Sequence, residues 1–451
     1  MTLRVAVVGS GPAGFYAAGA LLGSEDPRVA VDVFERLPTP WGLVRLGVAP
    51  DHPKIKSVSR AFEKIAQRPG FRFFGNVEVG RDVGHEELTE LYDAVVYAFG
   101  AQADRSMGIP GEDFTGSWSA TAFVAWYNGH PDFQGIPFDL SSERAIVVGN
   151  GNVAVDVARM LALTADELAP TDTTDEAIAA IVGSGIREIL VLGRRGPAQA
   201  AFTTPELQEL TELAGADLLV DPADLELDAA SVAALEDDTA IARRNVELLR
   251  EVAVRLPTGK SKALRLRFCV SPVAILGDGR VEAVEVVRNA LVADASGRIR
   301  SVPTDEGEVI PCGLVLRSVG YRGKPMPGVP FDDERDTIRN DGGRVLDDAD
   351  APVSGVYCTG WIKRGPSGVI GTNKKDAHET VELLLEDAAA GLLRRDDDSD
   401  VEDLLTERGV TPVTCSGWEA IDSLERARGE EQGRPRVKLG TWAELLDAAC
   451  P

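Results

Sequence analysis

The chain has 451 residues, of which 44% are hydrophobic and 26% charged, and its formal net charge at pH 7 is −25. This length allows two domains with cores of their own. The acidic balance argues against nucleic acid as a partner. No apolar run is long enough to cross a membrane, and the first residues already read as a core strand. We therefore expect no membrane association, no signal peptide and a cytoplasmic location.

The first glycine-rich turn follows an apolar strand expected over residues 3–8 and contains Gly9, Gly11 and Gly14. In a βαβ unit such a turn brings free N–H groups and the positive end of a helix to a pyrophosphate. Glu35 ends the next strand, about 20 residues further on, where an acidic side chain can accept both ribose hydroxyls. This pattern predicts a nucleotide without a 2′-phosphate, and FAD fits that description.

A second turn of the same type, at residues 149–154, follows an apolar strand at residues 145–148. The next strand, residues 188–192, leads to Arg194 and Arg195 in place of an acid. Two guanidinium groups would bind the 2′-phosphate of NADPH, which a carboxylate would repel. The second nucleotide is therefore predicted to be NADPH or NADP.

The five cysteines never come close enough in sequence for a CxxC or CxxxxC motif. They are Cys269, Cys312, Cys358, Cys415 and Cys450. This spacing argues against a dithiol reductase and against an iron–sulfur or zinc site in the chain itself. We expect no bound metal and unremarkable, mostly buried thiols.

The order of these motifs predicts an α/β fold with two Rossmann-like, glutathione-reductase-like domains, one inserted into the other. A third glycine turn follows a strand at residues 355–361, and a helix is expected from about 374 to 390. We assign residues 1–106 and 325–451 to an FAD-binding domain with a C-terminal extension. Residues 107–324 form the NADP-binding domain, closed by segments that include the alternating stretches 265–270 and 281–287.

One stretch of this acidic chain is basic. Residues 243–267 contain eight basic and two acidic side chains. A positive face of this kind can steer an acidic protein partner. A solvated helix face with ordinary ion pairs is the alternative interpretation.

Four segments carry a family resemblance, namely residues 38–56, residues 149–156, residues 193–197 with Phe202, Thr203 and Glu206, and residues 360–373. Together they resemble adrenodoxin reductase and the bacterial ferredoxin–NADP reductases of its type, in order and over nearly the whole chain. The resemblance implies an FAD enzyme that passes electrons between NADPH and a small iron–sulfur protein such as a ferredoxin.

The resemblance also implies roles for individual residues. The implied FAD contacts are Ala13, Glu35, Leu43, Val79, Trp361, Gly368, Val369 and Ile370. The implied NADPH contacts are Asn150, Gly151, Asn152, Val153, Arg194, Arg195, Glu206 and Gly368. In this family basic residues of the NADPH domain dock the iron–sulfur partner, and we place that role on Arg243, Arg244 and Arg250.

Hydride transfer needs the nicotinamide stacked on the flavin, and the flavin then supplies single electrons to an iron–sulfur acceptor. His52 can move a proton near the flavin edge, although a purely structural hydrogen-bonding role is equally compatible with its position. The resemblance places Asp156 and Glu206 in the same polar network. The alternatives are a flavin NADPH oxidase or monooxygenase, a subunit of a larger electron-transfer complex, and a nucleotide-binding redox module without turnover.

Overall fold

The computed structural model describes residues 2–237, 240–294, 298–393, 395, 397 and 399–450. The chain divides into two compact units. The first unit comprises Met1–Arg105 and Gly320–Pro451, and the second comprises Ser106–Val319. Among the described residues, no helix combines the length and the apolar character needed to cross a bilayer.

The first unit contains a seven-stranded sheet in which β1 is central and pairs in parallel with both β2 and β4. In sheet order the strands are β18 (Asn340–Asp341), β19 (Arg344–Leu346), β20 (Pro352–Cys358), β4 (Ala94–Tyr97), β1 (Thr2–Val8), β2 (Arg28–Phe34) and β3 (Phe71–Phe74). Strands β20 to β3 are parallel, whereas β18 and β19 extend the sheet in antiparallel fashion. The inner strands are apolar on both faces because both faces are covered.

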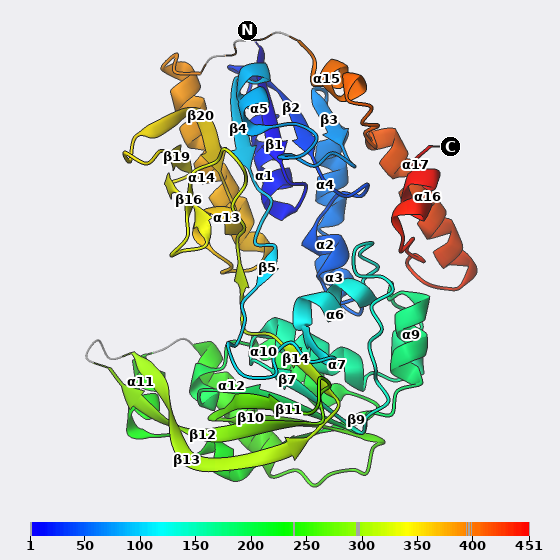
Figure 1. Ribbon diagram of the computed structural model, residues 1–451, viewed down its shortest axis with the longest axis vertical. Coiled ribbons are helices and arrows are strands. Elements are labelled where there is room, and N and C mark those ends of the chain that lie inside the picture. Colours follow the sequence, from blue (N-terminus) through cyan, green and yellow to red (C-terminus); the bar gives the residue numbers. More distant parts are fainter. Residues whose placement is uncertain are drawn as a thin grey trace. The chain divides into compact units, whose positions relative to one another are not determined.

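Two helices follow the glycine turns of this unit and pack against each other, α1 (Pro12–Leu21) and α14 (Ile370–Ala389). The other helices are α2 (Leu43–Leu46), α3 (Pro53–Lys56), α4 (Ser59–Ala66), α5 (His85–Leu91), α13 (Trp361–Arg364), α15 (Val401–Glu407), α16 (Cys415–Glu431) and α17 (Trp442–Ala449). Helices α16 and α17, red in Figure 1, contact each other, and α16 also contacts β3. Trp418 and Leu445 belong to the same hydrophobic cluster as Val5 and Phe62. The C-terminal extension is therefore part of the core of the first unit.

The second unit contains a six-stranded sheet that is parallel throughout. In sheet order its strands are β6 (Ser117–Ser119), β14 (Leu314–Arg317), β7 (Arg144–Val148), β8 (Glu188–Gly193), β10 (Lys262–Phe268) and β9 (Ala216–Val220). Its longer helices are α6 (Ala120–Tyr127), α7 (Asn152–Ala162), α9 (Asp175–Val182), α10 (Thr204–Glu212), α11 (Ala229–Asp237) and α12 (Ala240–Ala253). This parallel sheet and the largely parallel sheet of the first unit, each with covering helices, confirm the predicted α/β class and its two Rossmann-type domains.

The alternating stretch at residues 281–287 does not join this parallel sheet. It forms part of β12 (Ala283–Ala293), which pairs with β11 (Val270–Leu276) and β13 (Ile299–Pro311) in a separate antiparallel sheet. Strand β10 ends before residue 270 because Cys269 takes a positive φ of 56°, which breaks the strand. Alternation of buried and exposed residues along β12 is typical of an antiparallel strand with one solvated face.

Helix α14 begins at Ile370, four residues before the expected start near 374. The backbone N–H of Val369 donates to Thr372 Oγ1 over 3.1 Å, which caps the first turn. Gly368, with φ of 80°, directly precedes this cap. The glycine-containing loop that ends at Gly368 therefore leads directly into α14.

Candidate nucleotide-binding sites

The glycine turn of the first unit is packed tightly at two of its three glycines. A Cβ on Gly9 would lie 2.7 Å from the carbonyl oxygen of Ala98, and Gly9 has a φ of 108°. A Cβ on Gly14 would lie only 1.9 Å from the carbonyl oxygen of Gly9. The fold itself therefore requires glycine at both positions.

Gly11 has no such internal reason to be glycine. It caps α1 with φ −74° and ψ −174°, a conformation that any residue can adopt, and a Cβ there would meet nothing within 4 Å. Gly151, which caps α7 in the second unit, has φ −95° and the same open space. At both helix starts the backbone is left bare toward an open side, as a pyrophosphate needs in order to reach the helix N–H groups.

Glu35, directly after β2, lies at the first turn. Its Oε2 accepts hydrogen bonds from Ser10 N over 3.2 Å and Ser10 Oγ over 2.7 Å, and its Oε1 accepts from Leu37 N over 3.1 Å. A carboxylate offers about four acceptor positions, so roughly one remains. To accept both ribose hydroxyls, Glu35 would have to exchange the Ser10 hydroxyl for one of them.

The segment after Thr39 is tied to the same turn. Trp41 N donates to Ser10 O over 3.0 Å, and a Cβ on Gly42 would lie 3.0 Å from Gly11 Cα. Leu43 follows at the start of α2 with 49% of its surface exposed. By contrast, the side chain of Val79 is buried in a hydrophobic cluster with Phe34 and Phe74.

The carboxyl end of β20 approaches the first turn of α1. An added Cβ on Gly360 would lie 2.6 Å from Ala13 Cβ, and Gly360 N donates to Asp376 Oδ2 over 2.5 Å. The next residue, Trp361, stacks on Tyr321 with ring centroids 5.6 Å apart. This geometry brings Ala13 and Gly360 together at one edge of the parallel sheet.

A hydrogen bond fixes the Trp361 indole against the loop that follows it. Trp361 Nε1 donates to Ser367 O over 3.1 Å, just before Gly368. Gly368, Val369 and Ile370 form the entrance to α14, where Val369 is 61% exposed and Ile370 is partly buried. The residues predicted for this edge thus lie at the start of a 20-residue helix, whose N-terminal end favours negative charge.

In the second unit, the turn at residues 149–154 is connected to the segment that follows β8. Ala201 N donates to Asn150 O over 3.0 Å, and Thr203 N donates to Asn152 Oδ1 over 2.9 Å. A Cβ on Gly193 would lie 2.8 Å from Asn150 Nδ2. Val153 is the second residue of α7 and packs partly against the core. The end of β8, and with it Arg194, therefore lies beside the turn.

Arg194 is exposed and Arg195 half-buried, and neither guanidinium group has a hydrogen-bond or ion-pair partner within the part of the chain that the structure describes. Burial lowers the pKa of Arg195, and the positive charges of Arg194 and Arg298 lower it further. An uncompensated positive cluster in a chain of net charge −25 is suited to a dianion such as a 2′-phosphate.

Arg298 was not among the predicted residues. It lies at the turn of the β12–β13 hairpin, and its guanidinium likewise has no partner among the described residues. The hairpin is attached to the arginine loop, because Asn289 Nδ2 donates to Arg194 O over 2.9 Å. The nearby carboxylate of Asp294 instead pairs with Arg300 at 2.7 Å. No local sequence signal marks Arg298, since only the fold brings this hairpin to the loop.

The predicted acidic residues of the second unit meet around another unpredicted side chain, Arg159. This guanidinium is buried and lies 2.8 Å from Asp156 Oδ1 and 3.8 Å from Glu206 Oε2, and it also pairs with Glu209. His52 belongs to the first unit, where it caps the short helix α3 and is nearly buried. A polar network that includes His52 stays a prediction.

The basic stretch at residues 243–267 does not form one continuous positive face. Within it, Lys260 and Lys262 donate to backbone carbonyls, and the strand residues Arg265 and Arg267 pair with Glu188 and Glu308. The helical part is different. Arg243, Arg244 and Arg250 are all exposed on α12, although Arg244 lies 3.4 Å from Glu247 and 3.7 Å from Glu251.

Comparison with known proteins gives consistent matches. Residues 3–191 match the family model described as pyridine nucleotide-disulphide oxidoreductase. NADPH-ferredoxin reductase FprA of Mycobacterium tuberculosis is 51% identical over 457 residues, covering 98% of each chain. Human mitochondrial NADPH:adrenodoxin oxidoreductase is 44% identical, covering 99% of this chain and 91% of the relative. The structure of M. tuberculosis FprA in complex with NADPH aligns over the full length of both chains with a TM-score of 0.95 and 50% identity.

The open space at Gly11 and Gly151 leads to a paired prediction. Alanine at either position should leave the thermal stability of the nucleotide-free protein unchanged, since the new methyl group meets no protein atom. Gly11→Ala should weaken binding of FAD and spare NADP, whereas Gly151→Ala should do the reverse, each by about ten-fold or more. Titration of the apoprotein with each nucleotide measures this. Gly14→Ala is the contrasting control, because its clash with Gly9 should unfold the turn; unchanged affinities in both alanine variants would contradict the assignment.

Proposed function

The chain belongs to the adrenodoxin reductase-type ferredoxin–NADP reductases, and we propose that it transfers electrons between NADPH and a one-electron iron–sulfur protein such as a ferredoxin, with FAD as the intermediate carrier. The observation that carries this proposal is the pair of open glycine turns with opposite charges beside them. A carboxylate stands at one turn, and at the other stand guanidinium groups that have no partner among the residues the structure describes. Those two charges suit two different nucleotides.

FAD is assigned to the first unit. Gly9, Gly11 and Gly14 shape the turn that lets the pyrophosphate approach, and Glu35 accepts from the adenosine ribose. At the edge formed by β20 and α14, Trp361 and residues 368–370 are the residues that would hold the isoalloxazine. Bound FAD accepts hydride as two electrons and releases them singly, so the work of the protein is to orient the flavin and keep it in place.

NADPH is assigned to the second unit. The backbone at residues 150–153 receives its pyrophosphate, and Arg194 and Arg195 bind the 2′-phosphate, with Arg298 as a third cation from the hairpin. Arg159 pairs with Asp156 at 2.8 Å and lies 3.8 Å from Glu206 Oε2, which suits residues that orient the nicotinamide. We assign His52 the role of moving a proton at the flavin edge.

Flavin reduction tests the whole proposal. The purified protein should show a flavin spectrum, and anaerobic NADPH should bleach it at least about ten-fold faster than NADH. Stopped-flow absorbance measures this directly. A colourless protein, or a flavin that neither nucleotide reduces, would instead support a nucleotide-binding module. Cytochrome c reduction through added ferredoxin, compared with oxygen uptake, separates the reductase from an oxidase or monooxygenase.

Removal of the arginine charges should change nucleotide preference. Arg194→Ala and Arg195→Ala should each weaken NADPH by roughly 10- to 150-fold, since a charge-assisted hydrogen bond contributes about 1.5–3 kcal/mol, and both should spare NADH. Arg298→Ala should act in the same direction with a smaller effect. Arg300→Ala, on the same hairpin but paired with Asp294, is the matched control. Equal weakening of NADPH and NADH would remove the 2′-phosphate role.

The iron–sulfur partner is proposed to dock on the exposed side of α12, through Arg243, Arg244 and Arg250. The end of this helix also exposes apolar residues, since Val254 is 80% and Leu256 is 88% exposed. Cations around an apolar patch are suited to an acidic protein of small size. The cytoplasmic location expected from the sequence remains a prediction.

Charge reversal tests this surface. Arg250→Glu should raise the KM for ferredoxin about ten-fold at low salt, and the difference from wild type should shrink as salt is added. Reduction of ferricyanide, which needs no protein docking, should stay unchanged. Arg335→Glu, at another exposed arginine that lies in the first unit, supplies the control. An unchanged KM for ferredoxin in Arg250→Glu would move the docking surface elsewhere.

A further inference from the structure

We propose that the C-terminal extension, residues 415–450, is a working part of the flavin site, in which buried Glu425 acts as a positioning residue for the segment Trp41–Leu46. This inference rests on the proposed function, because it takes the Gly9–Gly14 turn to be the site of FAD. It adds a second layer to that site, formed by residues nearly 400 positions away in the sequence.

The segment in question forms one wall of the turn. Trp41 N donates to Ser10 O over 3.0 Å, and Gly42 lies so close to Gly11 that an added Cβ would be 3.0 Å from its Cα. Leu43, exposed at the start of α2, follows at once. A shift of this segment would therefore change the space into which the bare backbone of Gly11 opens.

The backbone of the segment is held in an unusual conformation. Trp41 has a φ of 82°, in the region that residues with a side chain rarely adopt, and Gly42 follows with 49°. Such a conformation persists where surrounding contacts fix it. The fixing contact comes from the C-terminal extension, because the buried ring of Trp41 meets Trp418 edge-on with centroids 4.8 Å apart.

A buried ion pair then fixes the other end of the segment. The Glu425 side chain is fully buried and accepts from Arg45 Nη1 over 2.8 Å and from Arg45 Nη2 over 2.5 Å. This is a bidentate pair, which sets orientation as well as distance. Lys438 Nζ donates to the carbonyl oxygen of Arg45 over 3.1 Å, so both the side chain and the backbone of Arg45 are held from the extension.

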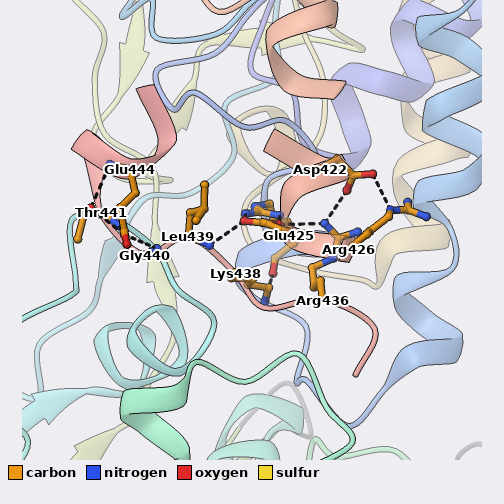
Figure 2. A network of polar contacts seen from close by, with 10 residues as sticks. Asp422, Glu425, Arg426, Arg436, Lys438, Leu439, Gly440, Thr441 and Glu444 are labelled. Carbon is orange, nitrogen blue, oxygen red and sulfur yellow. Dashed lines mark hydrogen bonds and ion pairs between the residues drawn. The ribbon is translucent and has the colours of Figure 1, made fainter. Parts of the chain in front are cut away.

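The carboxylate is also fixed from within the extension (Figure 2). Leu439 N donates to Glu425 Oε1 over 2.9 Å, and Arg436 Nη1 donates to Glu425 Oε2 over 3.1 Å. Asp422 accepts from the same Arg436 nitrogen over 2.6 Å, which balances the second cation. Burial alone would raise the pKa of the Glu425 carboxyl, but Arg45 and Arg436 outweigh it and hold that pKa below its ordinary value.

The directed hydrogen bonds and ion pairs of Glu425 are more than is needed to attach α16 to the rest of the unit. Apolar contacts alone can hold α16 on the core, whereas loss of one partner of a buried ion pair leaves the other charge without compensation. Replacement of Glu425 would leave the Arg45 guanidinium buried and unpaired. The segment Trp41–Leu46 would then move toward solvent, directly beside Gly11.

Glu425→Gln tests the proposal because it keeps the shape of the side chain and removes its charge. The dissociation constant of FAD, measured by fluorescence titration of the apoprotein, should rise about ten-fold or more. With FAD saturating, the KM for NADPH should stay within two-fold of wild type, since that nucleotide is assigned to the second unit.

Glu444→Gln is the matched control in the same extension. Glu444 accepts from Thr441 N over 3.1 Å and Thr441 Oγ1 over 2.9 Å and so caps α17. Within the described part of the chain it has no hydrogen bond or ion pair with the segment at 41–46. This variant should lower the melting temperature while the dissociation constant of FAD stays within two-fold of wild type. If the extension only stabilised the fold, loss of FAD affinity would follow the loss of melting temperature in both variants.

The inference is overturned if Glu425→Gln folds and binds FAD as wild type does, or if Glu444→Gln loses FAD to the same extent. Should Glu425→Gln fail to fold, Trp418→Phe decides, because it keeps an apolar ring but removes the larger edge contact with Trp41. It should weaken FAD several-fold, and unchanged affinity would overturn the proposal. Failure of the proposed function is seen separately, since wild type itself would then bind no FAD.

Discussion

Both nucleotide sites depend on one steric condition, a helix start whose backbone faces open space without a side chain. Gly11 and Gly151 meet this condition with ordinary backbone angles, so their value lies in the missing Cβ. The neighbouring glycines serve the fold, because Gly9, Gly14 and Gly149 each approach another backbone too closely for any larger residue. Each turn therefore combines glycines that allow the fold with one that leaves room for a ligand.

The charge beside each turn then distinguishes two otherwise similar sites. Glu35 is held at the first turn by Ser10 and Leu37, and a carboxylate in that place disfavours a 2′-phosphate. At the second turn, Arg194 and Arg195 stay unpaired among the described residues, in a chain with a large excess of acids. Most other arginines of the second unit have carboxylate partners. The lack of such partners at Arg194 and Arg195, among the described residues, leaves their charges available for a phosphate.

The sequence predicted the features that are local in the chain. A glycine turn, the strand before it and the charge after the next strand lie within a few dozen residues, so periodicity and spacing reveal them. The long-range features escaped prediction. Arg298 reaches the arginine loop only through the β12–β13 hairpin, whose pairing in a separate antiparallel sheet was not predicted, and Glu425 meets Arg45 only because α16 packs beside β3. Val79 is a different case, because the family resemblance implied an FAD contact there and the structure packs its side chain into the core.

The two sites also differ in how deeply their supporting charges are buried, and this difference fits the roles of the two nucleotides. FAD must stay bound through many turnovers, and the site we assign to it is supported by a fully buried ion pair, a tryptophan pair and a shared hydrophobic core. NADPH must leave after each hydride transfer, and its phosphate is assigned to an exposed Arg194 and a half-buried Arg195. Charges near solvent are screened and bind more weakly than buried pairs, which allows exchange. A nucleotide that stays bound and one that exchanges can thus use the same glycine turn, but the charges that support the first site are buried and those of the second lie near solvent.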